Sequence, residues 1–193
     1  EIRRINKVLE LYPDTRIRLD ANGAFDIETA LKLSEYLLKN NINLEYLEQP
    51  VKTIAEMAEL KLKLKAIGDI KIAADESVRK VSDPLAVAQA NAADILVLKA
   101  APLGGINNAL HIAKEAGLPV VVSSALETSV GISMGAHLAA LLNSEYASGL
   151  ATAALLTQDV TDSPLIPING EIPVTRITPN KKALTKLQAP ADR

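Results

Sequence analysis

Three acidic residues and one lysine stand at regular intervals in this sequence. Asp20, Glu48 and Asp75 are followed by Lys99, and successive members lie 24 to 28 residues apart. If the side chains converge, three carboxylates in a medium of low dielectric constant cannot all stay ionised without a compensating positive charge. Mg²⁺ prefers oxygen ligands and would supply that charge. Taken singly, each acid is more simply a loop cap or an ion-pair partner, but their succession predicts a magnesium site with Lys99 close by.

Each of these four residues closes a short apolar run, and a fifth run ends at Ser123. The five runs, which we expect to be strands, are residues 16–20, 44–48, 71–75, 95–99 and 119–123. Their interval accommodates one strand, one helix and two short loops. The segments between them carry helical signals, such as Asp26 as an N-cap. This alternation predicts a parallel sheet with helices outside, in which the carboxyl ends of all strands lie on one face.

Two architectures are compatible with a parallel sheet of this kind. A doubly wound sheet usually has a glycine-rich phosphate-binding turn after its first strand, and no such motif follows any predicted strand here. A (β/α)8 barrel places functional groups at the carboxyl ends of many strands, as this sequence does. We therefore predict an α/β fold of the (β/α)8-barrel type. A whole barrel takes roughly 250 residues, so we expect an incomplete barrel of about the last six strands, with a weak sixth strand near residues 145–148.

The C-terminal part of the sequence differs in character from the rest. Five prolines punctuate it, at positions 164, 167, 173, 179 and 190, and it shows little helical periodicity. We predict a partial barrel over residues 1–160, opening on a helix in residues 1–15. Residues 161–193 are predicted to form an extension that packs on the barrel.

Composition excludes several classes of protein. The formal net charge is -2, and aromatic residues make up 3% of the chain. An electrostatic nucleic-acid binder needs a strong basic surplus, so we expect no nucleic-acid partner. No stretch approaches the roughly 18 apolar residues that span a bilayer, so we expect no membrane partner. The sequence has no cysteine, which excludes thiolate chemistry and fits a cytoplasmic location.

Four segments around the predicted site resemble motifs of the enolase superfamily, in its muconate-lactonising branch. They are residues 18–23 (RLDANG), 46–50 (YLEQP), 74–77 (ADES) and 97–99 (VLK). Within that branch, residues 99–105 (KAAPLGG) and 123–131 (SSALETSVG) resemble o-succinylbenzoate synthases, particularly those of the actinobacterial type. The resemblance covers nearly the whole chain, and the first four motifs are more specific than the last two.

The resemblance implies Mg²⁺-dependent dehydration of a small carboxylate, 2-succinyl-6-hydroxy-2,4-cyclohexadiene-1-carboxylate, to o-succinylbenzoate in menaquinone synthesis. It implies that Asp20, Glu48 and Asp75 hold the ion, which stabilises the enediolate formed when the α-proton leaves. The ammonium of Lys99 would stabilise this intermediate from one side. In the family, a lysine on the second strand takes the proton.

The resemblance also makes three polar residues candidates for contact with the substrate. Asn22 is a candidate for supporting a ligand carboxylate or a bound water, and a turn-forming role explains it equally well. Ser123 and Ser124 fall where the ring or the succinyl tail would lie, with a loop N-cap as the alternative. Glu76 is left out of the metal set, because alternation along an extended chain would point it away from Asp75.

Two features of the family are expected N-terminal to residue 1. They are the second-strand Lys-x-Lys pair and the capping domain that closes over the substrate. Lys7 lies on the opening helix and cannot replace that pair, so the chain alone lacks the presumed base. We expect an N-terminal segment or an oligomer partner to complete the site.

Two alternatives to the synthase remain open. One is an N-acylamino acid racemase or a dipeptide epimerase of the same superfamily, which uses lysines on both faces of the substrate. Dipeptide epimerases often carry an Asp-x-Asp motif on the eighth strand, and residues 147–152 contain no aspartate. The other alternative is non-catalytic: an inactive fragment, or one part of a split enzyme.

Overall fold

The computed structural model describes residues 1–187, which divide into two compact units. The first unit holds Glu1–Leu96 with Ala116–Leu118. The second holds Val97–Glu115 and the chain from Pro119 onward. The predicted magnesium ligands therefore lie in the first unit, and Lys99 lies in the second.

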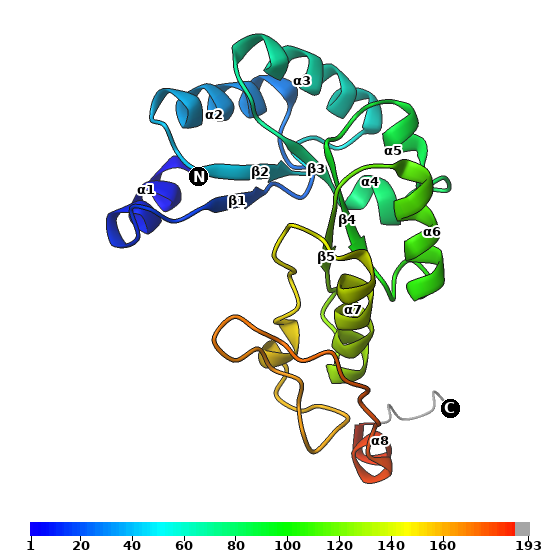
Figure 1. Ribbon diagram of the computed structural model, residues 1–193. Coiled ribbons are helices and arrows are strands. Elements are labelled where there is room, and N and C mark those ends of the chain that lie inside the picture. The colour runs from blue at the N-terminus through cyan, green and yellow to red at the C-terminus, as the bar shows by residue number, and fades with distance from the viewer. Residues whose placement is uncertain (188–193) are drawn as a thin grey trace, which may run out of the picture. The chain divides into compact units, whose positions relative to one another are not determined.

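Strands and helices alternate along the chain, as the sequence predicts (Figure 1). The strands are β1 (Ile17–Asp20), β2 (Leu44–Glu48), β3 (Ile72–Ala74), β4 (Ile95–Lys99) and β5 (Val120–Ser123). The helices are α1 (Ile2–Leu11), α2 (Ile27–Lys39), α3 (Ile54–Ile67), α4 (Glu76–Arg79), α5 (Ala86–Gln89), α6 (Ile106–Ala116), α7 (Ser129–Leu142), the 3₁₀ helix η1 (Thr152–Leu155) and α8 (Lys181–Leu187). The sheet order is β1-β2-β3-β4-β5, which is the order of a (β/α) barrel wall.

The pairing of β1, β2 and β3 fixes where their last residues stand. Both pairs are parallel. Asp20 is the partner of Glu48, and Glu48 is in turn the partner of Ala73. Asp75 thus comes two residues after Ala73, the residue that pairs with Glu48. Three neighbouring segments of the chain therefore place their carboxylates at the same end of the sheet.

A hydrophobic cluster joins α1, β1 and α2 in the first unit. Ile5 of α1 and Ile17 of β1 pack with Leu33 and Leu37 of α2. Helices α2 and α3 lie side by side over the strands of this unit (Figure 1). All three residues of β3 are fully buried, which suits a central strand of a parallel sheet covered on both faces.

Local capping signals explain where the long helices of this unit begin. The Asp26 side chain accepts a hydrogen bond from the backbone N–H of Thr29, at 2.7 Å, so it is the N-cap of α2 as predicted. Thr53 and Glu56 form a capping box at the start of α3, in which each side chain binds the other residue's backbone N–H.

In the second unit, the sixth strand that we expected near residues 145–148 is not formed. Instead Gly149 makes an isolated parallel bridge with Ser123 of β5. Asn143 ends α7 in the left-handed conformation, with φ 47° and ψ 47°. The chain then turns and reaches β5 only at Gly149, whose N–H donates to the carbonyl of Val122 at 2.8 Å. The contact is therefore too short to build a strand.

The segment after residue 160 contacts α7 through a few specific bonds. Leu165 is buried, and its N–H donates to the hydroxyl of Ser129 at 2.7 Å. Ser133 donates to the carbonyl of Thr175 at 2.5 Å. A short helix, α8, closes the described part, although the sequence showed little helical periodicity there. The division at residue 160 stays a prediction, and residues 188–193 of the predicted extension lie outside the described residues.

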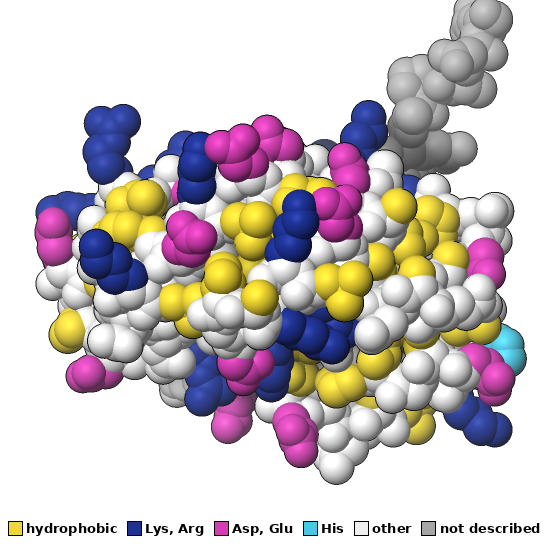
Figure 2. Space-filling model, turned by 90° about the horizontal axis from the view of Figure 1, so that it is seen from above, with side chains coloured by type: hydrophobic (Ala, Val, Ile, Leu, Met, Phe, Trp, Pro, Cys, Tyr) yellow, Lys and Arg dark blue, Asp and Glu magenta, His cyan; other side chains and the backbone are white. Residues whose placement is uncertain are grey.

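Charged side chains of both signs are interspersed on the face shown in Figure 2, with hydrophobic side chains between them. Among residues 1–187, no helix is both long enough and apolar enough to cross a membrane.

Candidate active site

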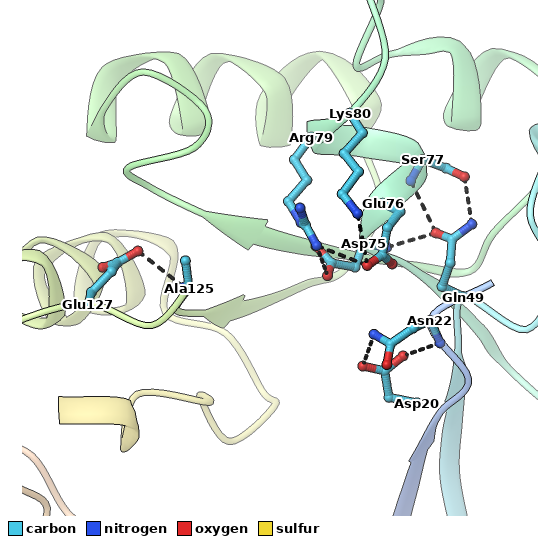
Figure 3. Close-up of polar contacts among 10 residues, drawn as sticks. All are labelled: Asp20, Asn22, Gln49, Asp75, Glu76, Ser77, Arg79, Lys80, Ala125 and Glu127. Carbon is cyan, nitrogen blue, oxygen red and sulfur yellow. Dashed lines mark hydrogen bonds and ion pairs between the residues drawn. The ribbon is translucent and has the colours of Figure 1, made fainter. Parts of the chain in front are cut away.

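The carboxylate of Asp20 is held by the turn that follows β1. The backbone N–H of Asn22 donates to Oδ1 of Asp20, and its side-chain amide donates to Oδ2, both at 2.8 Å (Figure 3). Asn22 has a φ of 46°, in the left-handed region that asparagine tolerates. The two explanations of Asn22 therefore hold together, because the residue makes the turn and also supports a predicted ligand.

The electrostatic environment of Asp20 is unfavourable for its negative charge. Burial raises the pKa of this carboxyl, and the charges of Glu76 and Asp75 raise it further, while the hydrogen bonds from Asn22 lower it. Three carboxylates are thus close enough to repel one another. A cation placed among them would relieve this repulsion.

Asp75 is almost completely buried and is ion-paired by Arg79 of α4. The guanidinium Nε and Nη2 donate to the two carboxylate oxygens at 2.8 and 3.2 Å. The Asp75 side chain is 1% exposed and that of Arg79 is 21% exposed, so the pair is partly shielded from solvent. A buried carboxylate needs such a partner, because an uncompensated buried charge is costly.

Glu76 lies beside Asp75 and shares its arginine, contrary to the prediction that it points away. The same Nη2 atom of Arg79 donates to Oε1 of Glu76 at 2.9 Å, and Lys80 lies 3.7 Å from that oxygen (Figure 3). The prediction was wrong because helix α4 begins at Glu76, so the alternation of an extended chain ends one residue earlier. The other oxygen, Oε2, is buried without a hydrogen-bond partner in the described part of the chain.

Gln49 connects the end of β2 to the start of α4, a role that no signal in the sequence indicated. Its side chain is fully buried. Its amide donates to the hydroxyl of Ser77 at 2.7 Å, and its carbonyl accepts from the N–H groups of Ser77 and Asp75 at 3.1 and 3.3 Å (Figure 3). This network fixes the turn that carries Asp75 and Glu76, beside the predicted ligand Glu48. The structure shows that this glutamine is buried, but no pattern of neighbouring residues in the sequence predicts it.

The chemistry of this donor set fits a hard dication. The carboxylates of Asp20, Glu48 and Asp75 would supply oxygen atoms from three neighbouring segments of the chain. Glu76 adds a buried oxygen that has no hydrogen-bond partner in the described part of the chain. As the side chains stand, however, no group of three or more His, Cys, Asp or Glu residues within 1–187 is arranged to hold a metal ion. The pair with Arg79 occupies Asp75 instead. The assignment of the three ligands stays a prediction.

The second unit contains the predicted lysine and serines. Lys99 is the last residue of β4, and Ser123 is the last residue of β5. The hydroxyl of Ser124 donates to the carbonyl of Gly149 and contacts the hydroxyl of Thr152, both at 2.9 Å. Ser124 thus binds the loop within the protein, in line with the structural alternative, and its contact with substrate stays a prediction, as does that of Ser123.

Glu127 lies just beyond these serines and was not among the predicted site residues. Its Oε1 atom accepts a hydrogen bond from the N–H of Ala125 at 3.1 Å (Figure 3). Burial raises the pKa of this carboxyl, and both that hydrogen bond and the charge of Lys99 lower it. The charge of Lys99 therefore acts on the carboxyl of Glu127 within the second unit.

Comparisons with known proteins found a family model and several relatives that match this chain. Residues 1–179 match the family model described as enolase C-terminal domain-like. The chain is 46% identical over 190 residues to the o-succinylbenzoate synthase of Thermobifida fusca (strain YX), covering 97% of this chain and 58% of that protein. It is 47% identical over 194 residues to the o-succinylbenzoate synthase of Mycobacterium tuberculosis (strain ATCC 25618 / H37Rv), covering 57% of that protein. The chain thus spans little more than half the length of these relatives.

Two solved structures show the same fold. The muconate lactonizing enzyme from Pseudomonas putida has a TM-score of 0.79 at 25% identity, covering 95% of this chain and 53% of that one. The L-Ala-D/L-Glu epimerase from Bacillus subtilis has a TM-score of 0.65 at 28% identity, covering 76% of this chain and 41% of that one.

Proposed function

Because this chain belongs to the enolase C-terminal domain-like family, we propose that it is the metal-binding part of an o-succinylbenzoate synthase, a lyase. The observation that carries the proposal is 46–47% identity to curated synthases over nearly the full chain. The proposed reaction dehydrates 2-succinyl-6-hydroxy-2,4-cyclohexadiene-1-carboxylate. The α-proton is lost first and the ring hydroxyl afterwards, which together make up one water molecule, and the product ring is aromatic.

The acidic residues of the first unit would bind the cofactor. Asp20, Glu48 and Asp75 would hold Mg²⁺ through their carboxylate oxygens. When bound, the ion supplies a fixed positive charge for the substrate carboxylate and for the negative charge that develops as the α-proton leaves. Asn22 keeps the carboxylate of Asp20 oriented, and Gln49 keeps the turn at Asp75 in place.

Lys99 would stabilise the same developing charge as an ammonium cation. A fixed cation lowers the barrier where charge grows in the transition state. The proton acceptor is not assigned to any residue of this chain. Ser123 and Ser124 are proposed to lie along the succinyl tail or the ring of the substrate. The ligand would be a small carboxylate, and we propose a cytoplasmic location for its conversion.

The test is a synthase assay of the complete protein that carries this chain, with and without Mg²⁺. We expect formation of o-succinylbenzoate that depends on the ion and is abolished by Asp75→Asn. Asp69→Asn is the matched control, because Asp69 is an exposed acid in the loop before β3. Loss of activity in both variants, or activity unchanged by removal of the ion, would contradict the proposal.

A second candidate is an N-acylamino acid racemase or a dipeptide epimerase. The structural similarity to an L-Ala-D/L-Glu epimerase favours it. Both reactions begin with loss of an α-proton. Dehydration then expels the ring hydroxyl, whereas racemisation returns a proton to the same carbon. Exchange of the α-proton of N-succinyl amino acids in deuterated water, measured beside the dehydration, separates the two functions.

A further inference from the structure

The loop that leads from β5 into α7, residues 124–128, is held at its start by the segment around η1 (Figure 1). Oγ1 of Thr152 lies 2.9 Å from Oγ of Ser124, and it donates to the carbonyl of Ala125 at the same distance. Ser124 is buried, and both its N–H and its hydroxyl donate to the carbonyl of Gly149, at 3.1 and 2.9 Å. Residues 149–152 therefore bind the first two residues of the loop.

The hydroxyl groups of Ser124 and Thr152 join this segment to the loop whichever way they point. Each hydroxyl has a single proton to donate. The proton of Thr152 reaches Ala125 or Ser124, and both belong to the loop. The proton of Ser124 reaches Gly149 or Thr152, and both belong to the segment. Removal of the Thr152 hydroxyl would therefore weaken the attachment of the loop in either arrangement.

The other end of the loop is held by Asp159. Ser129, the first residue of α7, is fully buried. Its N–H donates to the two carboxylate oxygens of Asp159 at 3.2 and 3.0 Å, and its hydroxyl donates to Oδ2 at 2.6 Å. A carboxylate is favoured at this end of a helix, because the helix dipole is positive there. Asp159 thus fixes the start of α7 from a position 30 residues later in the chain.

The loop held in this way follows the strand beside Lys99. Lys99 ends β4 and Ser123 ends β5, and these strands are neighbours in the sheet. Both residues, the loop and the segment that holds it belong to the second unit. In a (β/α) barrel the loops at the carboxyl ends of the strands form the active site. The loop is therefore placed where it can contact a substrate that reaches Lys99.

We propose that Thr152 and Asp159 are positioning residues for substrate binding, because they hold the two ends of the loop 124–128. This inference rests on the proposed function, in which Ser123 and Ser124 lie along the succinyl tail or the ring. Contacts made equally in the ground state and in the transition state change KM and leave kcat unchanged. Loss of either positioning residue should therefore raise KM.

The first experiment measures the loop without turnover. Amide hydrogen exchange of residues 123–129 is followed in the complete protein, with and without o-succinylbenzoate. We expect the product to slow this exchange. In the free protein, Thr152→Val and Asp159→Ala should make it roughly 2- to 10-fold faster, the range for loss of one hydrogen bond, while exchange in β4 stays unchanged. Thr152→Ser keeps the hydroxyl and should restore the original rate.

Thr157→Val and Glu171→Gln are the matched controls, because both residues are exposed in the same C-terminal part of the chain. Neither substitution should change exchange in the loop. Unchanged exchange in Thr152→Val and Asp159→Ala would overturn the proposal, and so would equally faster exchange in β4, which indicates a loss of global stability.

The second experiment tests what the held loop does. In Thr152→Val and Asp159→Ala we expect KM for dehydration to rise roughly 2- to 10-fold, with little change in kcat, and Thr152→Ser should restore KM. A merely structural role would instead reduce the fraction of folded enzyme, which lowers the apparent kcat and leaves KM unchanged. That result in both variants would overturn the proposal.

The outcomes separate this inference from the proposed function. If the protein makes o-succinylbenzoate but KM is unchanged in Thr152→Val and Asp159→Ala, the inference fails and the function stands. If no dehydration is found, the proposed function fails. Exchange in the free proteins then still shows whether the two residues hold the loop, and exchange with o-succinylbenzoate shows whether the loop binds this ligand.

Discussion

The buried carboxylate of Asp75 sets the main electrostatic problem of this site. The guanidinium of Arg79 compensates the charge of Asp75 through two hydrogen bonds. Glu76 accepts a hydrogen bond from the same guanidinium. A dication bound to Asp75 would compete with Arg79 for the same oxygens. Arg79 then has Glu76 as a remaining partner, so its charge would not be left alone when the ion binds.

This competition predicts how Arg79→Met behaves. Without Mg²⁺, the variant leaves Asp75 buried with its arginine removed, and we expect the free energy of unfolding to fall by about 3 kcal/mol. With saturating Mg²⁺ the loss should shrink, because the ion supplies the missing charge. Urea denaturation with and without the ion measures both values.

Lys63→Met is the matched control, since Lys63 makes an exposed pair with Glu59 on α3. Exposed pairs contribute roughly 0–1 kcal/mol, so this variant should change little under either condition. Equal losses in the two variants, or a loss in Arg79→Met that Mg²⁺ leaves unchanged, would refute the competition.

At the scale of elements, the loops after the strands position the acids, and the helices hold those loops. Gln49 joins the end of β2 to the first turn of α4 through buried hydrogen bonds. Helix α3 intervenes between β2 and β3, and its capping box fixes where it starts.

The capping box predicts a pH-dependent contribution to stability. The hydrogen bonds from Thr53 lower the pKa of Glu56 below its ordinary value. An acid whose pKa is lower in the folded state adds stability above its unfolded pKa, and that stability is lost as the pH falls through the folded pKa. Glu56→Gln should therefore destabilise the protein at neutral pH, and the difference from the original protein should disappear in acid.

Thermal unfolding followed by circular dichroism between neutral and acid pH measures this difference. Glu59→Gln serves as the control, because Glu59 lies on the same helix outside the first turn. A difference between Glu56→Gln and the original protein that is independent of pH would refute the assignment of the cap.

At the scale of the whole molecule, the acids of the first unit are predicted to bind Mg²⁺, so the ion should stabilise the fold. A ligand that binds only the folded state adds about 2.7 kcal/mol at a concentration 100 times its dissociation constant. We expect the Tm of the complete protein to rise with Mg²⁺ and to fall again with a chelator. In Asp20→Asn the rise should be much smaller, and an equal rise in that variant would contradict the assignment of Asp20.

The sequence by itself determined the alternation of strands and helices, the last residues of β1, β2, β4 and β5, and the N-cap at Asp26. These features depend on residues close together in the chain, such as apolar periodicity and a capping side chain, so they can be recognised locally. The tertiary structure decided the ion pair of Asp75 with Arg79, the buried contacts of Gln49, and the hydrogen bond between Glu127 and Ala125. It also reduced the expected sixth strand to one bridge at Gly149. These outcomes depend on which side chains come into contact when the chain packs, and on where a helix interrupts an extended segment. Neither can be recognised from residues that lie close together in the sequence.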